Sequence, residues 1–234
     1  MAVYAISDLH LALSIHKPMD IFGPRWEDYM EKLKMFWEET VANDDYVIIA
    51  GDVSWATYLK EAYEDFKFIN SLPGNKIITK GNHDYWWTTQ KKLCEFLDEN
   101  DFNTIKFLQN SSIKVEDIII CGTRGWNCPG DEEFGPQDRK IYERELNRLK
   151  LSLASIKKED NEKIMVVLHF PPFNSKGEPS DFIDIMKKNN VEICVYGHLH
   201  GASCLKAVEG TIEGISYSLI SADYLGFKPI EISR

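Results

Sequence analysis

The sequence predicts an α/β fold, and two observations support this class. Short runs rich in β-branched and aromatic residues alternate with amphipathic helical segments through most of the chain. After residue 200 the pattern changes to short runs separated by glycines, without room for helices. We therefore expect either one mixed sheet or two packed sheets with helices outside them.

The expected strands are short and evenly distributed. Before residue 200 we place them near 2–7, 45–50, 75–80, 112–121, 163–169 and 191–196. After residue 200 we expect antiparallel strands at 202–208, 215–221 and 227–233.

Two of the helical segments carry an apolar stripe with the helical period, so we expect both stripes to face the core. The stripes are Leu59, Ala62, Phe66 and Ile69, and Tyr142, Leu146, Leu149, Leu153 and Ile156, the second within an expected helix 137–156. Two long segments, 11–24 and 122–137, fit neither helix nor strand. Long loops in a compact domain are usually functional, so we interpret both as walls or lids of a site.

Length and composition indicate a folded, soluble protein. The 234 residues fit one large domain, 1–234, and 44% of them are hydrophobic, which is enough for a packed interior. No apolar run is long enough to span a membrane, and the first residues lack the pattern of a signal peptide. A cytoplasmic location is the expectation.

Charge and cysteine usage exclude some classes. The net charge of −10 opposes general binding to nucleic-acid backbones, which needs a basic surface. A phosphate substrate is not excluded, because bound divalent ions reverse the local charge. The five cysteines are odd in number and lack C-x-x-C spacing, so we expect reduced packing residues and neither disulfides nor a thiolate metal site.

Five short motifs each begin where an expected strand ends. They are SDLH with Asp8 and His10, GD with Asp52, GNHD with Asn82, His83 and Asp84, LHFPP with His169, and GHLHG with His198 and His200. Ligand sites in open α/β sheets lie beyond the carboxyl ends of strands. We therefore expect all five motifs to meet at one crevice.

The spacing within these motifs suits metal binding. Residues i and i+2 of an extended segment point the same way, so Asp8 with His10 and His198 with His200 form pairs. Imidazole, carboxylate and amide groups without sulfur suit Mn, Fe, Co or Zn. Any one motif alone is also compatible with a structural role, but five of the six histidines fall inside the motifs, which favours a joint function.

The order and spacing of the motifs resemble the calcineurin-like metallophosphoesterase superfamily, whose pattern is D-x-H, GD, GNH[DE], H and GHxH. The resemblance implies a four-layer α/β/β/α sandwich of two mixed β-sheets flanked by helices. It also implies two metal ions. The first would be bound by the residues Asp8, His10, Asp52 and His200, and the second by Asp52, Asn82, His169 and His198.

The sequence departs from the Ser/Thr protein phosphatase branch of this superfamily. Here GD continues as Val53, Ser54 and Trp55 rather than into a D-R-G element, and the arginine expected shortly before GNH is missing. The aromatic run Tyr85, Trp86 and Trp87 and the segment TRGW, Thr123 to Trp126, resemble instead a bacterial-type phosphohydrolase related to that branch. We expect a phosphorylated small molecule or a phosphopeptide as substrate.

The expected reaction is hydrolysis of a phosphate ester by in-line attack of a hydroxide that bridges the two metals. The resemblance implies that His83 is the acid or the donor to the leaving oxygen, oriented by Asp84. A buried histidine in a turn is the alternative for His83, and the cap of a helix near Tyr85 is the alternative for Asp84.

Arg124 is a candidate for substrate binding, because it lies in the unassigned segment 122–137 and a guanidinium matches phosphate oxygens. A plain surface role is its alternative. Among functions, we place phosphomonoesterase first, phosphodiesterase or nucleotide pyrophosphohydrolase second, and nuclease third. A non-catalytic metal-binding scaffold is the alternative from another functional class. The presence of His83 in addition to the complete set of ligands argues against it. The sequence does not indicate the oligomeric state.

Overall fold

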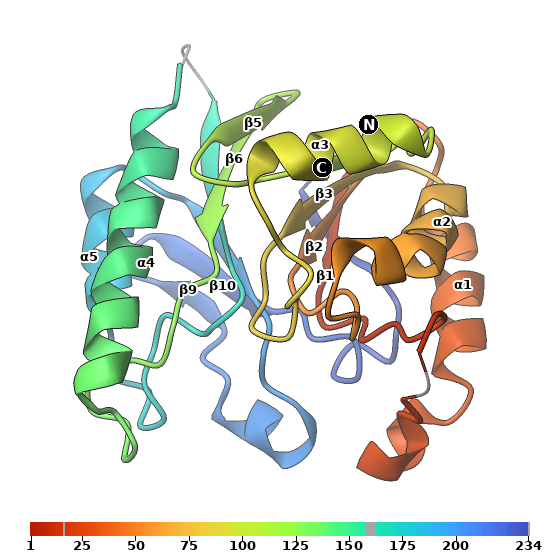
Figure 1. Ribbon diagram of the computed structural model, residues 1–234. Helices are drawn as coiled ribbons and strands as arrows, with labels where there is room; N and C mark the ends of the chain where they lie inside the picture. Colours follow the sequence, from red (N-terminus) through yellow and green to blue (C-terminus); the bar gives the residue numbers. More distant parts are fainter. Residues whose placement is uncertain (16, 158–161, 234) are drawn as a thin grey trace. The chain divides into compact units, whose positions relative to one another are not determined.

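The computed structural model describes residues 1–15, 17–157 and 162–233 (Figure 1). The chain divides into two compact units. Unit 1 comprises Met1–Phe107 and Ile220–Arg234, and unit 2 comprises Leu108–Leu219. Each unit has its own β-sheet and its own hydrophobic core. The expectation of a single domain, 1–234, stays a prediction.

The sheet of unit 1 has the strand order β11-β1-β2-β3-β4. Strands β1 to β4 are parallel to their neighbours, and β11 pairs antiparallel with β1 at one edge. The strands are β1 (Val3–Ile6), β2 (Tyr46–Ala50), β3 (Asn75–Thr79), β4 (Ile105–Phe107) and β11 (Ile230–Ser233). Because β1, β2 and β3 are parallel, the motifs that follow them leave the sheet at the same edge.

Three α-helices and three short 3-10 helices accompany this sheet among the described residues. They are η1 (Asp20–Phe22), η2 (Pro24–Trp26), α1 (Tyr29–Thr40), η3 (Leu59–Ala62), α2 (Tyr63–Ser71) and α3 (Gln90–Glu99). Helix α1 buries Leu33 and Trp37, and α2 buries Phe66 and Ile69, in one cluster with strand residues such as Ile49. The first predicted stripe therefore faces the core as expected, with Leu59 only partly buried.

The sheet of unit 2 has the order β5-β6-β7-β8-β10-β9. Its four inner strands are parallel, and both edge strands pair antiparallel. The strands are β5 (Ser112–Val115), β6 (Ile118–Thr123), β7 (Lys163–Leu168), β8 (Ile193–Tyr196), β9 (Gly210–Ile212) and β10 (Ile215–Leu219).

The helices of unit 2 are α4 (Pro136–Ala154), α5 (Asp181–Lys188) and the 3-10 helix η4 (Gly201–Lys206). Helix α4 packs on β6 and on α5, and α4 and α5 are drawn together in Figure 1. The second predicted stripe faces this core: Tyr142, Leu146, Leu149 and Leu153 are buried, and Ile156, just beyond the helix, is partly buried.

The predicted class, two mixed β-sheets flanked by helices, is confirmed. Four details differ from these expectations. The run 112–121 is a hairpin of two strands, because the chain turns at Glu116 with a φ of 52°. Segment 202–208 is mostly η4, and β10 pairs antiparallel with β9 as expected but parallel with β8. Strands β4 and β9 have three residues each, too few for a recognisable alternation.

The helices and the cysteines bear on two further expectations, the absence of a membrane-spanning segment and the packing role of the cysteines. Among the described residues, none of the helices has the length and apolar character that a membrane crossing requires. The five cysteines are all free thiols, and four of them are buried while Cys94 is exposed. This agrees with the expected packing role for the buried four.

Candidate metal centre

In unit 1 the loops after β1 and β2 run side by side and carry three predicted ligands. The backbone N–H of Asp8 donates to the Gly51 carbonyl at 2.9 Å, and that of His10 donates to the Asp52 carbonyl at 3.0 Å. Asp8, His10 and Asp52 all have positive φ, at 58°, 48° and 50°. This conformation is costly for residues other than glycine and is concentrated at functional sites.

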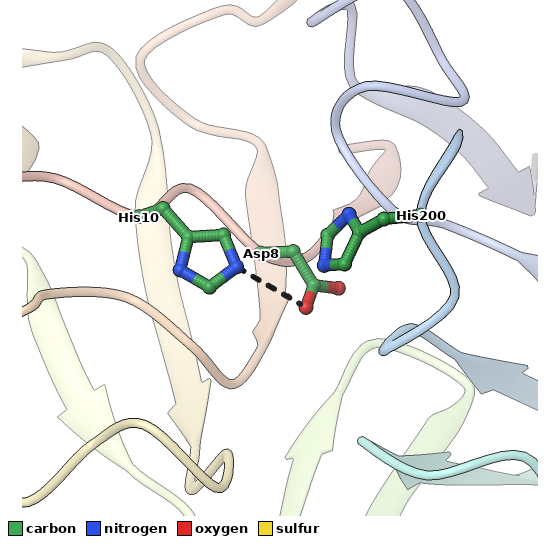
Figure 2. Close-up of side chains that lie close together, drawn as sticks. All are labelled: Asp8, His10 and His200. Atoms are coloured by element: carbon green, nitrogen blue, oxygen red, sulfur yellow. Dashed lines mark ion pairs between the residues drawn. The ribbon is translucent and has the colours of Figure 1, made fainter. Parts of the chain in front are cut away.

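The side chains of these three residues converge. The Nε2 atom of His10 lies 3.9 Å from Asp8 Oδ1, as drawn in Figure 2, and 3.9 Å from Asp52 Oδ2. Both separations are too long for hydrogen bonds. They fit two ligand atoms on one ion, since bonds of about 2.0–2.2 Å allow up to roughly 4 Å between them. All three residues are at least 95% buried, so these donors fit a bound transition metal.

Two glycines permit the close approach of the GD and GNHD motifs. A Cβ on Gly81 would lie 2.1 Å from Asp52 Oδ1, and a Cβ on Gly51 would lie 2.5 Å from the Gly81 nitrogen. Gly51 also has a φ of 86°. The two loops therefore pack backbone against backbone: a side chain at Gly81 would displace Asp52, and one at Gly51 would displace Gly81.

Asp84 is completely buried and holds these loops together. Its carboxylate accepts backbone N–H bonds from Gly81 at 2.7 Å, Asp52 at 2.9 Å and Val53 at 2.9 Å. It also accepts the Trp86 indole N–H at 3.1 Å. Burial raises the pKa of Asp84 to about 6, and the backbone N–H donors oppose this rise. Because its oxygens face these donors, Asp84 positions Asp52 and the GNHD turn.

Neither earlier interpretation of Asp84 describes these contacts. Its hydrogen bonds go to backbone groups and to Trp86, and none goes to His83. The next α-helix begins only at Gln90, where Thr89 provides the cap. The sequence could not reveal this role, because the partners of Asp84 lie about thirty residues away as well as next to it.

His83 lies within the same turn, directly after Asn82. Its backbone N–H donates to Asp52 Oδ1 at 2.8 Å. Its ring lies 4.5 Å from the Trp55 ring, centroid to centroid, and Trp55 in turn stacks on His10 at 4.8 Å. Asn82 and His83 are both half-buried. The turn therefore gathers a predicted ligand and the predicted donor beside Asp52.

Sequence reasoning missed two serines that support Asp8. Ser7 and Ser221 both donate hydroxyl hydrogen bonds to Asp8 Oδ2, the latter at 3.3 Å. Ser7 and Ser221 also face each other in a parallel bridge. Serine is too common for either to stand out, and Ser221 lies more than two hundred positions from Asp8.

In unit 2, His169 and His198 follow β7 and β8, and their rings lie 5.1 Å apart, nearly perpendicular. The His169 backbone N–H donates to the Arg124 carbonyl at 3.0 Å, and the His169 carbonyl accepts the Gly197 N–H at 3.0 Å. The Phe170 ring packs on His198 at 3.9 Å between centroids. Both histidines are thus held by neighbouring loops of their own unit.

His200 is the N-cap residue of the 3-10 helix η4. Its backbone N–H donates to the Ser203 hydroxyl at 2.8 Å, and that hydroxyl donates back to the His200 carbonyl at 2.7 Å. The His200 side chain is half-buried. This capping fixes the backbone of His200 and leads the chain away from the extended run that the sequence suggested.

Arg124 lies next to a buried carboxylate that the sequence did not reveal. Its guanidinium is 3.3 Å from Glu145 Oε1 and lies over the Trp126 ring, 4.3 Å from the centroid. Glu145 is fully buried and also contacts Arg148 at 2.7 Å. The side chain of Arg124 is 11% exposed. Arg124 thereby connects helix α4 to the loop that holds His169, and its role towards substrate stays a prediction.

Comparison with known families identifies one match. The family model described as calcineurin-like phosphoesterase matches residues 1–202. This range includes every predicted metal ligand. Comparison with curated proteins finds no relative that matches.

Solved structures with a similar fold exist at low sequence identity. A protein of unknown function from Aquifex aeolicus is 18% identical with a TM-score of 0.51, over 98% of this chain and 95% of that one. A phosphopantetheinyl hydrolase from Mycobacterium tuberculosis is 13% identical with a TM-score of 0.58, over 99% of this chain and 95% of that one. At such identities the likeness concerns the fold alone.

Proposed function

Because this chain belongs to the calcineurin-like phosphoesterase family, we propose that it is a metal-dependent phosphoesterase acting on phosphomonoesters. The observation that carries the metal dependence is the convergence of His10 Nε2 on Asp8 and Asp52, at 3.9 Å from an oxygen of each. Buried carboxylates and an imidazole at these separations have the chemistry of a transition-metal site.

We propose that two transition-metal ions, Mn, Fe, Zn or Co, are held by the seven predicted ligands, with Asp52 shared. The ligand set is Asp8, His10, Asp52, Asn82, His169, His198 and His200. When bound, the ions would supply an activated water and neutralise the oxygens of the phosphoryl group. The residues of the chain then have three tasks: to hold the metal ions, to position the ligands and to donate a proton to the leaving oxygen.

In the proposed reaction, a water oxygen forms a bond to phosphorus and the bond from phosphorus to the alcohol oxygen breaks. His83 donates the proton that the departing alcohol oxygen requires. Its backbone N–H is bound to Asp52, so its position is tied to a proposed ligand. Asp84 keeps Asp52 and the turn in place through its backbone hydrogen bonds.

Arg124 is proposed to bind an oxygen of the substrate phosphate from its place beside Glu145. Two observations support this proposal. The fork-shaped guanidinium matches phosphate oxygens, and the Arg124 carbonyl accepts the N–H of the proposed ligand His169, which ties Arg124 to the proposed site. Arg124→Ala should lower kcat/KM by a factor that differs between substrates, and Arg124→Lys should recover little. An equal small change for every ester would leave Arg124 with a packing role only.

The test of the proposed function is a metal-reconstituted activity screen. Purified protein is loaded separately with Mn, Fe, Zn or Co and assayed on phosphomonoesters, diesters, nucleotides, phosphopeptides and a phosphopantetheinyl ester. We expect the highest kcat/KM for phosphomonoesters and no turnover after chelation. Preference for diesters would instead support a phosphodiesterase, and tight metal binding without any turnover would support a scaffold.

A further inference from the structure

A pocket of about 410 Å³ lies within unit 2 and includes the predicted ligand His198 in its wall. Its volume falls within the range of about 300–1,000 Å³ that small-molecule sites occupy. Under the proposed function, on which this inference rests, the phosphate would be bound at the ligands, and the alcohol portion of the ester would have this pocket beside it.

Aromatic rings form much of the pocket wall. The rings belong to Trp126, Phe134, Phe170, Phe173 and Tyr196. Phe170 packs directly on His198, so the aromatic surface continues up to the proposed ligand. The faces of such rings carry partial negative charge and attract cations as well as apolar groups.

The Trp126 side of the wall is fixed before any ligand binds. The Trp126 indole N–H donates to Asp138 Oδ1 at 2.9 Å, and its ring packs on Phe170 at 4.9 Å between centroids. The Arg124 guanidinium lies over the same ring. A ring held by three neighbours does not need to be ordered by the ligand, which favours binding.

The segment beyond Trp126 is held in the same manner. The Asp131 carboxylate accepts the Cys128 N–H at 2.9 Å and the Ser175 N–H at 2.7 Å. The Asn174 amide donates to the Pro129 carbonyl at 3.2 Å. Of the two interpretations of segment 122–137, these contacts favour a wall over a lid.

The charge of the lining is mainly negative. Asp131, Glu132 and Glu133 contribute carboxylates, and Lys206 is the lysine among the lining residues. Glu132 and Glu133 are exposed, and within the described part of the chain neither forms an ion pair. An anionic alcohol portion, such as a nucleotide or an acidic peptide, would be repelled here, whereas a cationic portion would be attracted.

We propose that this pocket binds an ammonium group on the alcohol portion of the substrate, so that the preferred substrates are phosphate esters of amino or quaternary-ammonium alcohols. Aromatic faces and carboxylates together form a site for an organic cation. The pocket thus selects the alcohol, while the metal ligands select the phosphate.

The first experiment measures binding alone. Choline is titrated into the protein in parallel with its neutral isostere, in which a tert-butyl group replaces the trimethylammonium group, and protein-observed NMR gives both dissociation constants. We expect choline to bind about tenfold more tightly, as cation–π contacts imply. Equal or tighter binding of the isostere would overturn the proposal.

The second experiment tests the charge at the pocket. The double variant Glu132→Gln/Glu133→Gln should reduce the preference for choline about threefold. The control, Glu116→Gln/Glu143→Gln, makes the same change of net charge at exposed residues of unit 2 outside the pocket lining. It should leave the preference unchanged. An equal effect of both double variants would overturn the proposal.

The third experiment compares kcat/KM for phosphocholine, the phosphate of the isostere, and an anionic monoester of similar size. We expect this order of preference. Hydrolysis of all three at equal rates would refute the pocket proposal and leave the proposed function intact. Charge-dependent choline binding without hydrolysis of any ester would refute the proposed function, and with it the preferred substrates, but it would leave the binding of an ammonium group at the pocket intact.

Discussion

The predicted ligands of unit 1 and those of unit 2 differ in charge and in backbone conformation. In unit 1, Asp8, His10 and Asp52 are buried, two of them are carboxylates, and all three have positive φ. In unit 2 the predicted ligands are three histidines, and among these His198 is the one with positive φ, at 72°. Unit 1 thus presents buried carboxylates on a strained backbone, and unit 2 presents imidazoles alone.

This difference indicates a division of labour. Two buried carboxylates in a fixed frame repel each other until a cation arrives, so unit 1 should provide most of the free energy of metal binding. Neutral imidazoles add directed bonds but no charge. A substitution of a carboxylate ligand should therefore cost more metal affinity and more activity than a substitution of a histidine in unit 2.

The most direct test of this division compares Asp52→Asn with His200→Asn. Asp52→Asn should lower kcat/KM on the order of 10⁴-fold, which corresponds to about 5 kcal/mol, and should reduce the content of both metals. His200→Asn should reduce the content of one metal and lower kcat/KM less, about 10²-fold. Metal analysis of dialysed protein and steady-state kinetics give both values. Equal losses in the two variants would contradict the division.

A second test compares the two carboxylates that organise the loops. Asp84→Ala leaves four backbone N–H groups and the Trp86 indole without their acceptor, so unfolding free energy should fall by about 4 kcal/mol. Asp131→Ala in unit 2 leaves two backbone N–H groups and should cost about 2 kcal/mol. Urea unfolding measures both. A larger loss of unfolding free energy in Asp131→Ala than in Asp84→Ala would show that the loops of unit 1 depend less on their buried carboxylate than those of unit 2.

A third test separates metal binding from proton donation inside unit 1. His83→Gln should retain the metals while kcat/KM falls about 10²–10³-fold, because the leaving oxygen loses the proposed proton donor. The loss should shrink for nitrophenyl phosphate, whose leaving group needs little protonation. The Asp52→Asn variant serves as the comparison, since its loss should be the same for both kinds of ester. An equal loss of kcat/KM in His83→Gln for both kinds of ester would count against proton donation by His83.

The sequence predicted the parts of the site that depend on local pattern. The motifs sit at the ends of β1, β2, β3, β7 and β8, and both helical stripes reach the cores, because period and strand-end position are local properties. The short strand β4 was not predicted, because three residues show no alternation. The 3-10 helix η4 was not predicted either, because the hydrogen bonds of Ser203 with His200 override a β-like run.

The supporting contacts could not be predicted, since they join distant residues. Asp84 was singled out by its place next to His83, yet its acceptor role depends on Asp52 and Val53 across the loop. Glu145 lies in no motif of the sequence, yet it is buried against Thr123 and Arg124. Such contacts exist only once the sheet has aligned the loops.

The interiors of the two units also differ in how they titrate. In unit 1, Lys76 is fully buried and donates to the carbonyls of Leu72 at 2.5 Å and Gly74 at 2.8 Å, and burial lowers its pKa to about 8. In unit 2, burial raises the pKa of the Cys121 thiol to about 12. The two groups should therefore change stability with pH in opposite directions.

The sign follows from proton binding. Between pH 8 and the ordinary lysine value of 10.5, the unfolded chain binds a proton at Lys76 that the folded chain has released, so stability rises with pH in this window. From pH 7 to 10 the gain should be about 2 kcal/mol.

Cys121, whose folded pKa lies above its unfolded value of 9.0, stabilises the fold below that value and loses this contribution as pH rises towards 12. Measured by urea unfolding at pH 7 and pH 10, Lys76→Met should lose stability relative to the parent on going to the higher pH. Cys121→Ala should gain relative to the parent. A Lys76→Met variant with the same pH dependence as the parent would show that the Lys76 amine stays charged in the folded state.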